Sequence, residues 1–278
     1  MVSKIEEEVT EALKSYDGSK SPGLDEMNFN FIKGNRKIIM LILKCNRPES
    51  MKDFRPIILV SPMYKLLAEV LSNRLKKVIR SIIGEVQLAF VSGRQIIDGF
   101  IITDEIFHKW KKDKNGGLLV KLDFEKAYDS VDHGYLDFMM GEMGFVDYFP
   151  MEQFGIEQGL HQGDPLSPFL FNIAIDGFHR LFMKANELDL IRGVVFDDNN
   201  VHISHLQFVD DTMVFLQPRL DYLLNAKRIL RCFELSSGLR MNSHKSCVTR
   251  IGKVGTGEED WAKLFLCKQG SLPITYLG

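Results

Sequence analysis

The chain has 278 residues, of which 45% are hydrophobic and 26% are charged, and its net charge is −2. This length predicts one large domain or two domains of about 150 residues, and the composition excludes wholesale disorder. The near-zero net charge excludes a uniformly basic nucleic-acid coat but not a local basic groove.

No segment has the character of a membrane span or a secretory signal. The longest apolar runs, such as Ile38–Leu43, are far shorter than the ~20 residues that a span needs. The N-terminal segment is acidic and has no long apolar stretch. The four cysteines form no C-x-x-C pair, so neither a zinc knuckle nor a disulfide framework is supported. We therefore expect an intracellular protein of the nucleus or cytoplasm, neither secreted nor bound to a membrane.

The first part of the chain predicts three helices. Ser3 caps a helix over residues 3–16, and a Gly- and Pro-containing break follows at 17–23. A long helix is predicted over 62–83 and another over 95–112. The helix over 62–83 has apolar residues at helical spacing, namely Leu67, Leu71, Leu75, Val78 and Ile82.

From residue 115 onward, strands and helices mix. Short apolar runs predict strands at 118–124, in two pieces over 203–216, and at 246–251. Helices are predicted around Leu136–Met143, from Pro165 to Phe182, and over 219–237, where Gly238 ends the last one. Because there is no regular β-α-β alternation, the predicted fold class is α+β.

Three carboxylates lie in apolar surroundings. Asp123 ends an apolar strand, and Asp210 and Asp211 occupy the tip of an apolar hairpin. A buried carboxylate is normally paired or bound to a metal, and a cluster of carboxylates suits Mg²⁺. Two such ions can drive an in-line displacement by a 3′-hydroxyl. The alternative is an ordinary polar turn and an acid at a strand end.

Eight motifs around these acids occur in a fixed order and together resemble the finger and palm motifs of reverse transcriptases. The finger-like motifs are DGSKSPGLDEMNFNFIK (17–33), DFRPIILVSPMYKLLAEVLSNRLKKVI (53–79) and QLAFVSGRQIIDG (87–99). The palm-like motifs are KLDFEKAYDSVDH (121–133), GLHQGDPLSPFLFNIAID (159–176), HLQFVDDTMVF (205–215), SGLRMNSHKS (237–246) and ITYLG (274–278). The resemblance is closest to the plant branch of the non-LTR (LINE-type) retrotransposon enzymes.

This resemblance implies a right-hand polymerase with an antiparallel palm sheet flanked by helices. On this resemblance we expect residues 1–112 to form a fingers-like region and residues 113–278 to form a palm-like region that ends at the start of the primer-grip motif, without a thumb. The implied activity is RNA-directed DNA synthesis. The implied partners are an RNA template, a DNA primer and deoxynucleoside triphosphates. The implied cofactor is a pair of Mg²⁺ ions, with Mn²⁺ as a substitute; the oligomeric state is left open.

The family roles carry over to positions of this chain. The carboxylates of Asp123, Asp210 and Asp211, with the Phe124 carbonyl, are the implied metal ligands. Lys245 matches a lysine that protonates the pyrophosphate leaving group. Its ordinary alternative is a solvated surface lysine.

The nucleotide-binding roles fall on five further residues. Tyr128 matches the aromatic residue under the incoming sugar, which disfavours a 2′-hydroxyl, and its alternative is core packing. Gln162 and Gly163 match the segment beside nucleotide and template. Arg55 matches the arginine that grips the triphosphate, and Lys44 is a second contact of the same kind.

Arg94, Arg74 and Lys77 are candidates for nucleic-acid backbone contacts, although a basic flank is more often a solvated face.

The sequence departs from the family pattern in two places. Only residues 146–158 separate Phe145 from the Gly159 motif, where the family has a helix and two strands, and the segment after Lys33 is also short. These departures motivate an alternative function, a catalytically inactive remnant that at most binds nucleic acid. A metal-dependent nuclease using the same acids is a more distant alternative.

Overall fold

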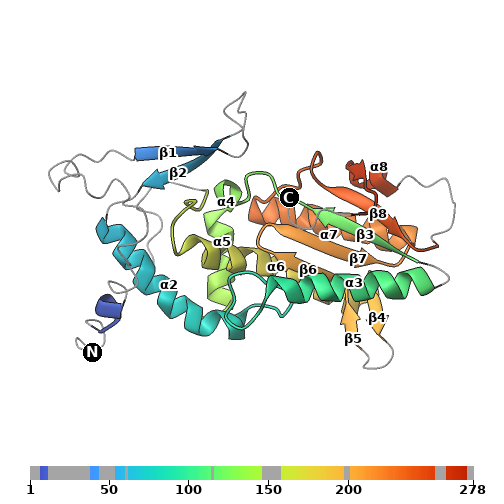
Figure 1. Ribbon diagram of the computed structural model, residues 1–278, viewed down its shortest axis with the longest axis horizontal. Helices are drawn as coiled ribbons and strands as arrows, with labels where there is room; N and C mark the ends of the chain where they lie inside the picture. Colours follow the sequence, from blue (N-terminus) through green and yellow to red (C-terminus); the bar gives the residue numbers. More distant parts are fainter. Residues whose placement is uncertain are drawn as a thin grey trace. The chain divides into compact units, whose positions relative to one another are not determined.

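Figure 1 shows a computed structural model of the chain. It describes residues 7–11, 62–113, 116–145, 158–196, 201–253 and 261–273, and the backbone alone of 38–43 and 54–59. The chain divides into two compact units, Met1–Ile79 with Leu160–Phe169, and Arg80–Gly159 with Leu170–Gly278. The division at residue 112 into fingers-like and palm-like regions remains a prediction.

The first unit contains a short helical segment at residues 7–11, a β-hairpin and most of a long helix. The hairpin strands β1 (Ile38–Leu43) and β2 (Phe54–Leu59) are antiparallel, with Ile42 opposite Arg55. The helix α2 (Pro62–Ile82) agrees with the predicted range of 62–83. The hairpin was not predicted, because its strands carry no strict alternation of apolar and polar residues.

The predicted apolar face of α2 is wrong by about one residue. Leu67 and Val78 are 57% and 42% exposed, although both were placed on the buried face. Ala68, Ser72, Leu75 and Ile79 are buried and recur at helical spacing, and Val70 is buried beside them. Ser72 fits this buried stripe because its hydroxyl donates to the Ala68 carbonyl at 2.6 Å. Ala68 and Ser72 therefore belong to the buried face, whereas a prediction from hydrophobicity alone placed that face at the adjacent leucines.

A five-stranded sheet forms the centre of the second unit (Figure 1). Its strand order is β6-β7-β3-β8-β9, and every neighbouring pair is antiparallel except β8–β9. The strands are β3 (Gly117–Leu122), β6 (His205–Phe208), β7 (Asp211–Leu216), β8 (Cys247–Ile251) and β9 (Lys268–Gln269). The predicted α+β class with a mainly antiparallel sheet is confirmed.

Several helices flank this sheet. They are α3 (Ile96–Lys112), α4 (Ala127–Ser130), α5 (His133–Glu142), α6 (Ser167–Glu187), α7 (Leu220–Ser237) and α8 (Trp261–Phe265). The bounds of α3, α5, α6 and α7 lie close to the predicted ones, whereas the short helices α4 and α8 were not predicted. Gly238 ends α7 as predicted, in the left-handed region at φ 77°, and its N–H donates to the Glu234 carbonyl. A small hairpin of β4 (Val194–Phe196) and β5 (Val201–Ile203) was not predicted.

The sheet is buried on both faces, which explains why all of β3 is buried. On one face, Ile106 and Trp110 of α3 pack with Leu119, Met213 and Phe215. On the other face, aromatic rings of α6 and α7 pack around Phe124, with Phe178 and Phe233 in edge contact with it. A strand covered on both sides reads as a nearly continuous apolar run, and β3 has that character.

Some predictions fall outside the described residues. These are most of the helix predicted over 3–16, the shortened segments at 146–157 and after Lys33, and the final motif at 274–278. Within the residues that the structure does describe, no helix is both long enough and apolar enough to cross a membrane.

The aromatic cluster behind the sheet yields a stability prediction. Phe178 is fully buried, so Phe178→Ala leaves a cavity and lowers the free energy of unfolding by about 3–5 kcal/mol. The matched control is Leu235→Ala on α7, where the side chain is 71% exposed and the expected change is within about 0.5 kcal/mol. Urea denaturation followed by circular dichroism measures both; equal losses would contradict the packing described.

Candidate active site

Strand register brings Asp123 next to Asp211. β3 and β7 are antiparallel, and Leu122 lies opposite Thr212. Asp123 follows Leu122 and Asp211 precedes Thr212, so both acids lie at the end of this ladder, and the charge of Asp123 acts on Asp211. Two acids far apart in the sequence therefore meet at one end of the central strands.

The third acid, Asp210, lies in the turn between β6 and β7. Phe208 pairs with Asp211, which leaves Val209 and Asp210 as a two-residue hairpin turn. Val209 adopts φ 59° and is the turn residue with a positive φ, an arrangement that normally selects glycine at this first position. A β-branched residue there costs about 1–3 kcal/mol. The turn that carries Asp210 is therefore held in a strained conformation.

The backbone of Asp123 is fixed by the loop that precedes β8. Its N–H donates to Ser246 Oγ at 3.1 Å, and its carbonyl accepts from the Asn242 N–H at 2.7 Å. The Asp123 atom Oδ1 is buried and has no hydrogen-bond partner. The other carboxylate oxygen lies 3.6 Å from Nζ of Lys245. Asp123 thus presents an unpaired buried oxygen beside a lysine.

A second lysine, Lys121, lies beside Asp211. Its Nζ is 3.9 Å from Oδ1 of Asp211, and both side chains are largely buried. Burial raises the pKa of Asp211 to about 6; Lys121 and Lys245 act to lower it, while Asp210 and Asp123 raise it further. The three acids and two lysines therefore lie within electrostatic reach of one another.

Tyr128 belongs to the same cluster. Its ring stacks on Phe171, with 5.0 Å between ring centroids and 24° between the planes. Burial, followed by the charge of Asp210, raises the pKa of the Tyr128 phenol to about 12. Tyr128 therefore both packs against Phe171 and lies close enough to Asp210 to be affected by its charge.

The donor chemistry of this cluster fits a hard divalent cation. Carboxylate oxygens are the ligands that Mg²⁺ prefers, and the buried Oδ1 of Asp123 lacks a partner. Over the described ranges, no three or more His, Cys, Asp or Glu side chains are grouped closely enough to hold a metal. Lys121 and Lys245 supply the positive charge that the carboxylates need in this arrangement.

The other predicted nucleotide contacts belong to the first unit or lie outside the description. Gln162 and Gly163 form a turn ahead of α6, with Gly163 at φ 92°. The neighbouring Asp164 accepts a 2.8 Å hydrogen bond from the Tyr64 hydroxyl. Arg55 is described by its backbone alone, and Lys44 lies outside the described residues. The roles of these residues remain predictions.

The predicted backbone-binding residues differ in their surroundings. Nη1 of Arg94 donates to the carbonyls of Gly84 and Gln87 at 2.7 and 2.8 Å, so this guanidinium already holds a loop. Arg74 forms an ion pair with Glu8, and Lys77 is exposed. Of the three, Lys77 has the surroundings that a nucleic-acid contact most simply requires.

Two residues near the acids were missed from the sequence. Lys121 interrupts an otherwise apolar strand two residues before Asp123, and this was a usable signal because a buried lysine needs a counter-charge. Gln87 accepts a hydrogen bond from the Val209 backbone N–H at 3.2 Å. No sequence signal gave that contact, because 122 positions separate the two residues.

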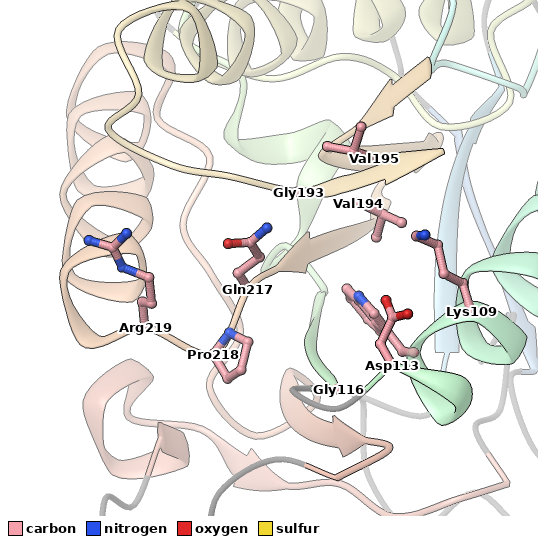
Figure 2. A pocket seen from close by; sticks show the side chains of 10 residues that line it. Lys109, Asp113, Gly116, Gly193, Val194, Val195, Gln217, Pro218 and Arg219 are labelled. Atoms are coloured by element: carbon pink, nitrogen blue, oxygen red, sulfur yellow. The ribbon is translucent and has the colours of Figure 1, made fainter. Parts of the chain in front are cut away.

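A cavity of about 410 Å³ lies at the opposite end of the sheet (Figure 2). Its lining includes Gly116, which lies just before β3, and Gln217, which lies just after β7. The acids lie at the other ends of these two strands. Its two basic side chains have protein partners: Arg219 pairs with Asp221, and Lys109 lies over the Phe196 ring. The cavity is therefore separate from the acidic cluster.

Residues 42–278 match the family of reverse transcriptases (RNA-dependent DNA polymerases). The chain therefore belongs to the reverse transcriptase family. The transposon TX1 uncharacterized 149 kDa protein of Xenopus laevis is 27% identical over 287 residues. That match covers 86% of this chain, and the chain spans 21% of that protein. The predicted likeness to non-LTR retrotransposon proteins is confirmed.

Two further similarities concern a shorter segment and the fold. The uncharacterized mitochondrial protein AtMg01250 of Arabidopsis thaliana is 42% identical over 55 residues, which is 20% of this chain and 45% of that protein. A structure of telomerase from Candida albicans in complex with the TWJ fragment of telomeric RNA has a TM-score of 0.50 at 12% identity, covering 76% of this chain and 41% of that one. The latter similarity concerns the fold alone and agrees with the α+β class.

The charges around Asp211 predict opposite pKa changes in two variants. Lys121→Met removes a neighbouring cation and raises the pKa of Asp211, whereas Asp210→Asn removes a neighbouring anion and lowers it. Side-chain NMR titration without divalent metal measures both. Because the pKa of Asp211 in the folded protein is raised, its contribution to stability is greatest at low pH and declines as pH rises through about 6.

The same titration includes a control. Lys268→Met removes a lysine that does not contribute to the pKa of Asp211, and the expected value stays at about 6. Changes of the same sign in Lys121→Met and Asp210→Asn would contradict the electrostatic arrangement of the cluster.

Proposed function

We propose that this chain is an RNA-directed DNA polymerase domain of retrotransposon origin. It adds deoxynucleotides to the 3′-hydroxyl of a primer that is paired with an RNA template. The observation that carries the proposal is the register of β3 and β7, which brings Asp123 beside Asp211 and the Asp210 turn. Family membership over residues 42–278 supports the same activity.

Asp123, Asp210 and Asp211, with the Phe124 carbonyl, are the proposed ligands of the catalytic cations. When bound, two Mg²⁺ or Mn²⁺ ions polarise the primer hydroxyl and neutralise the leaving pyrophosphate. The unpaired buried Oδ1 of Asp123 supports this assignment. So does the pKa of Asp211, which burial raises to about 6 and which the charges of Asp210 and Asp123 raise further, because strongly perturbed pKa values cluster at functional sites.

Two side chains of the cluster are assigned to the nucleotide. Lys245 is the proposed proton donor to the leaving pyrophosphate, and its 68% exposed side chain can move from Asp123 toward a bound triphosphate. Tyr128 is the proposed floor under the sugar, held in place by stacking on Phe171. Arg55, Lys44, Gln162 and Gly163 are proposed for the triphosphate and the template strand.

The plant branch and the remaining partners belong to the same proposal. The 55-residue similarity to the Arabidopsis thaliana protein supports a plant element. Lys77, with Arg74 and Arg94, is proposed to lie near the nucleic-acid backbone. An RNA template, a DNA primer and deoxynucleoside triphosphates are the proposed partners, and the nucleus or cytoplasm is the proposed location.

Primer extension tests the activity directly. On a poly(rA)·oligo(dT) substrate with Mg²⁺ or Mn²⁺, the wild-type chain extends the primer. Asp210→Asn lowers the rate about 1000-fold, because cation-dependent stabilisation of the transition state amounts to several kcal/mol. Asp221→Asn is the matched control, since it changes an exposed acid on α7 and leaves the rate unaffected.

The absence of extension by folded wild-type protein, across a range of both metals, would overturn the activity. Equal salt-dependent binding of an RNA–DNA duplex by the wild type and Asp210→Asn would then favour the inactive remnant. Release of mononucleotides from a labelled duplex would instead favour the nuclease.

The sugar role of Tyr128 makes a separate prediction. Tyr128→Val opens space beneath the sugar and lowers the preference for deoxynucleotides over ribonucleotides about 10- to 100-fold. The control is Tyr135→Phe, which removes a hydroxyl bonded to the Ala174 carbonyl and leaves the preference unchanged. Single-nucleotide incorporation with each triphosphate measures the ratio. An unchanged ratio in Tyr128→Val would restrict Tyr128 to packing.

A further inference from the structure

The turn that carries Asp210 is bonded by a side chain from a distant part of the chain. Oε1 of Gln87 accepts from the Val209 N–H at 3.2 Å and from the Ala89 N–H at 3.1 Å. Gln87 is buried, with only 2% of its surface exposed. One buried oxygen therefore ties the turn to the segment after α2.

The Val209 N–H needs this acceptor. In a two-residue hairpin the strand ladder ends at the flanking pair, here Phe208 and Asp211, so the N–H of the first turn residue has no partner within the ladder. Val209 is partly buried, and Gln87 supplies the acceptor that the ladder does not. Val209 is also held at φ 59°, which a β-branched residue rarely adopts. The bond to Gln87 stabilises a turn conformation that valine itself disfavours.

The backbone of Gln87 is fixed against β6. The Leu88 N–H donates to the Gln207 carbonyl, and the Gln207 N–H donates to the Val86 carbonyl, both at 2.9 Å. Nη1 of Arg94 donates to the Gln87 carbonyl at 2.8 Å. The oxygen of the Gln87 side chain is therefore presented from a rigid position.

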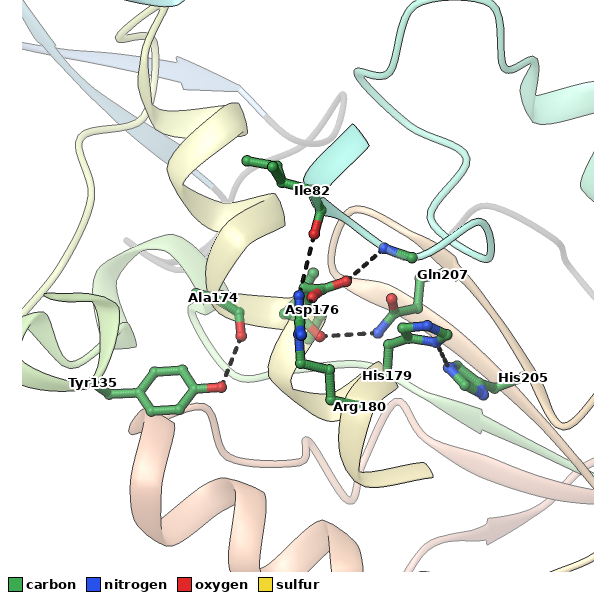
Figure 3. A network of polar contacts seen from close by, with 10 residues as sticks. Ile82, Tyr135, Ala174, Asp176, His179, Arg180, His205 and Gln207 are labelled. Atoms are coloured by element: carbon green, nitrogen blue, oxygen red, sulfur yellow. Dashed lines mark hydrogen bonds and ion pairs between the residues drawn. The ribbon is translucent and has the colours of Figure 1, made fainter. Parts of the chain in front are cut away.

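The start of this segment is anchored to α6 (Figure 3). Asp176 accepts from the Gly84 N–H and from Nε of Arg180, each at 2.7 Å. Arg180 also donates to the Ile82 carbonyl at 3.2 Å. A side chain at Gly84 would place its Cβ 2.2 Å from the His179 ring, so the close approach requires glycine. The anchoring explains how a connecting segment can act as a support.

We propose that Gln87 is a positioning residue that holds the Val209–Asp210 turn in its active conformation. Its side-chain oxygen bonds the Val209 N–H and thereby fixes where the Asp210 carboxylate lies relative to Asp123. The inference rests on the proposed polymerase function for its consequence in catalysis. The hydrogen bond itself is testable without any activity.

Amide hydrogen exchange measured by NMR tests the bond. In the wild type, the Val209 amide is protected. In Gln87→Met, which keeps the side-chain length but lacks the acceptor, it exchanges about tenfold faster, consistent with the loss of one hydrogen bond. The amides of Met213 and Val214 in β7 keep their rates. The control is Gln207→Met, which removes an equally buried amide that donates to the Ile175 carbonyl and not to the turn.

Activity provides the second measurement. Because displacements near 1 Å can cost about 100-fold in rate, Gln87→Met lowers kcat for primer extension, per folded molecule, by about 10- to 100-fold with KM for the nucleotide unchanged. Adding Val209→Gly restores most of kcat, because glycine adopts φ near +60° at little cost. A loss caused only by weaker core packing would not be restored by glycine in the turn.

An unprotected Val209 amide in the wild type would overturn the inference, and this result does not depend on whether Gln87→Met folds. Equal Val209 exchange rates in the wild type and Gln87→Met would overturn it as well. If the wild type extends no primer, the proposed function fails, and the exchange measurement alone decides the role of Gln87.

Discussion

The register of β3 and β7 is the constraint on which the candidate site depends. The register of β3 and β7, together with the short turn after β6, concentrates negative charge at one end of the sheet. The chain offsets this charge with Lys121 on the same strand as Asp123 and with Lys245 on the loop before β8. β3, which precedes Asp123, is buried along its whole length, and a one-residue shift of its register would move its side chains to the opposite face. A bound cation completes the same balance in the proposed enzyme.

The site combines several features that are unfavourable for stability alone. Val209 adopts a disfavoured φ, Asp123 has a buried oxygen without a partner, and the pKa of Asp211 is raised. Such features persist only where the surrounding structure determines them. Here the surroundings are the aromatic packing of α6 and α7, the apolar face of α3, and the Gln87 segment bonded to β6. A strained turn and an unpartnered buried oxygen at one place are consistent with a site shaped for a ligand.

Local and periodic features were predictable from the sequence, and long-range polar contacts were not. The bounds of α3 and α7 and the strand before Asp123 follow from apolar spacing and from Gly238. The buried face of α2 was misassigned because Ala68 and Ser72, rather than a neighbouring leucine, occupy buried positions on it. Arg94 was assigned to nucleic acid because its charge is visible in the sequence, whereas its carbonyl partners at Gly84 and Gln87 depend on the folded loop. Gln87 has no charge or periodicity that marks it.

The central proposal is that Asp123, Asp210 and Asp211 together bind a cation, and paramagnetic broadening by Mn²⁺ tests this proposal most directly. With substoichiometric Mn²⁺, the account predicts that broadening is centred on the cluster and is strongest for these three residues and the adjacent Lys121 and Lys245. Signals of the β4–β5 hairpin are unaffected, and the centred broadening is absent in Asp210→Asn. Uniform broadening, or broadening centred elsewhere in the chain, would contradict the account.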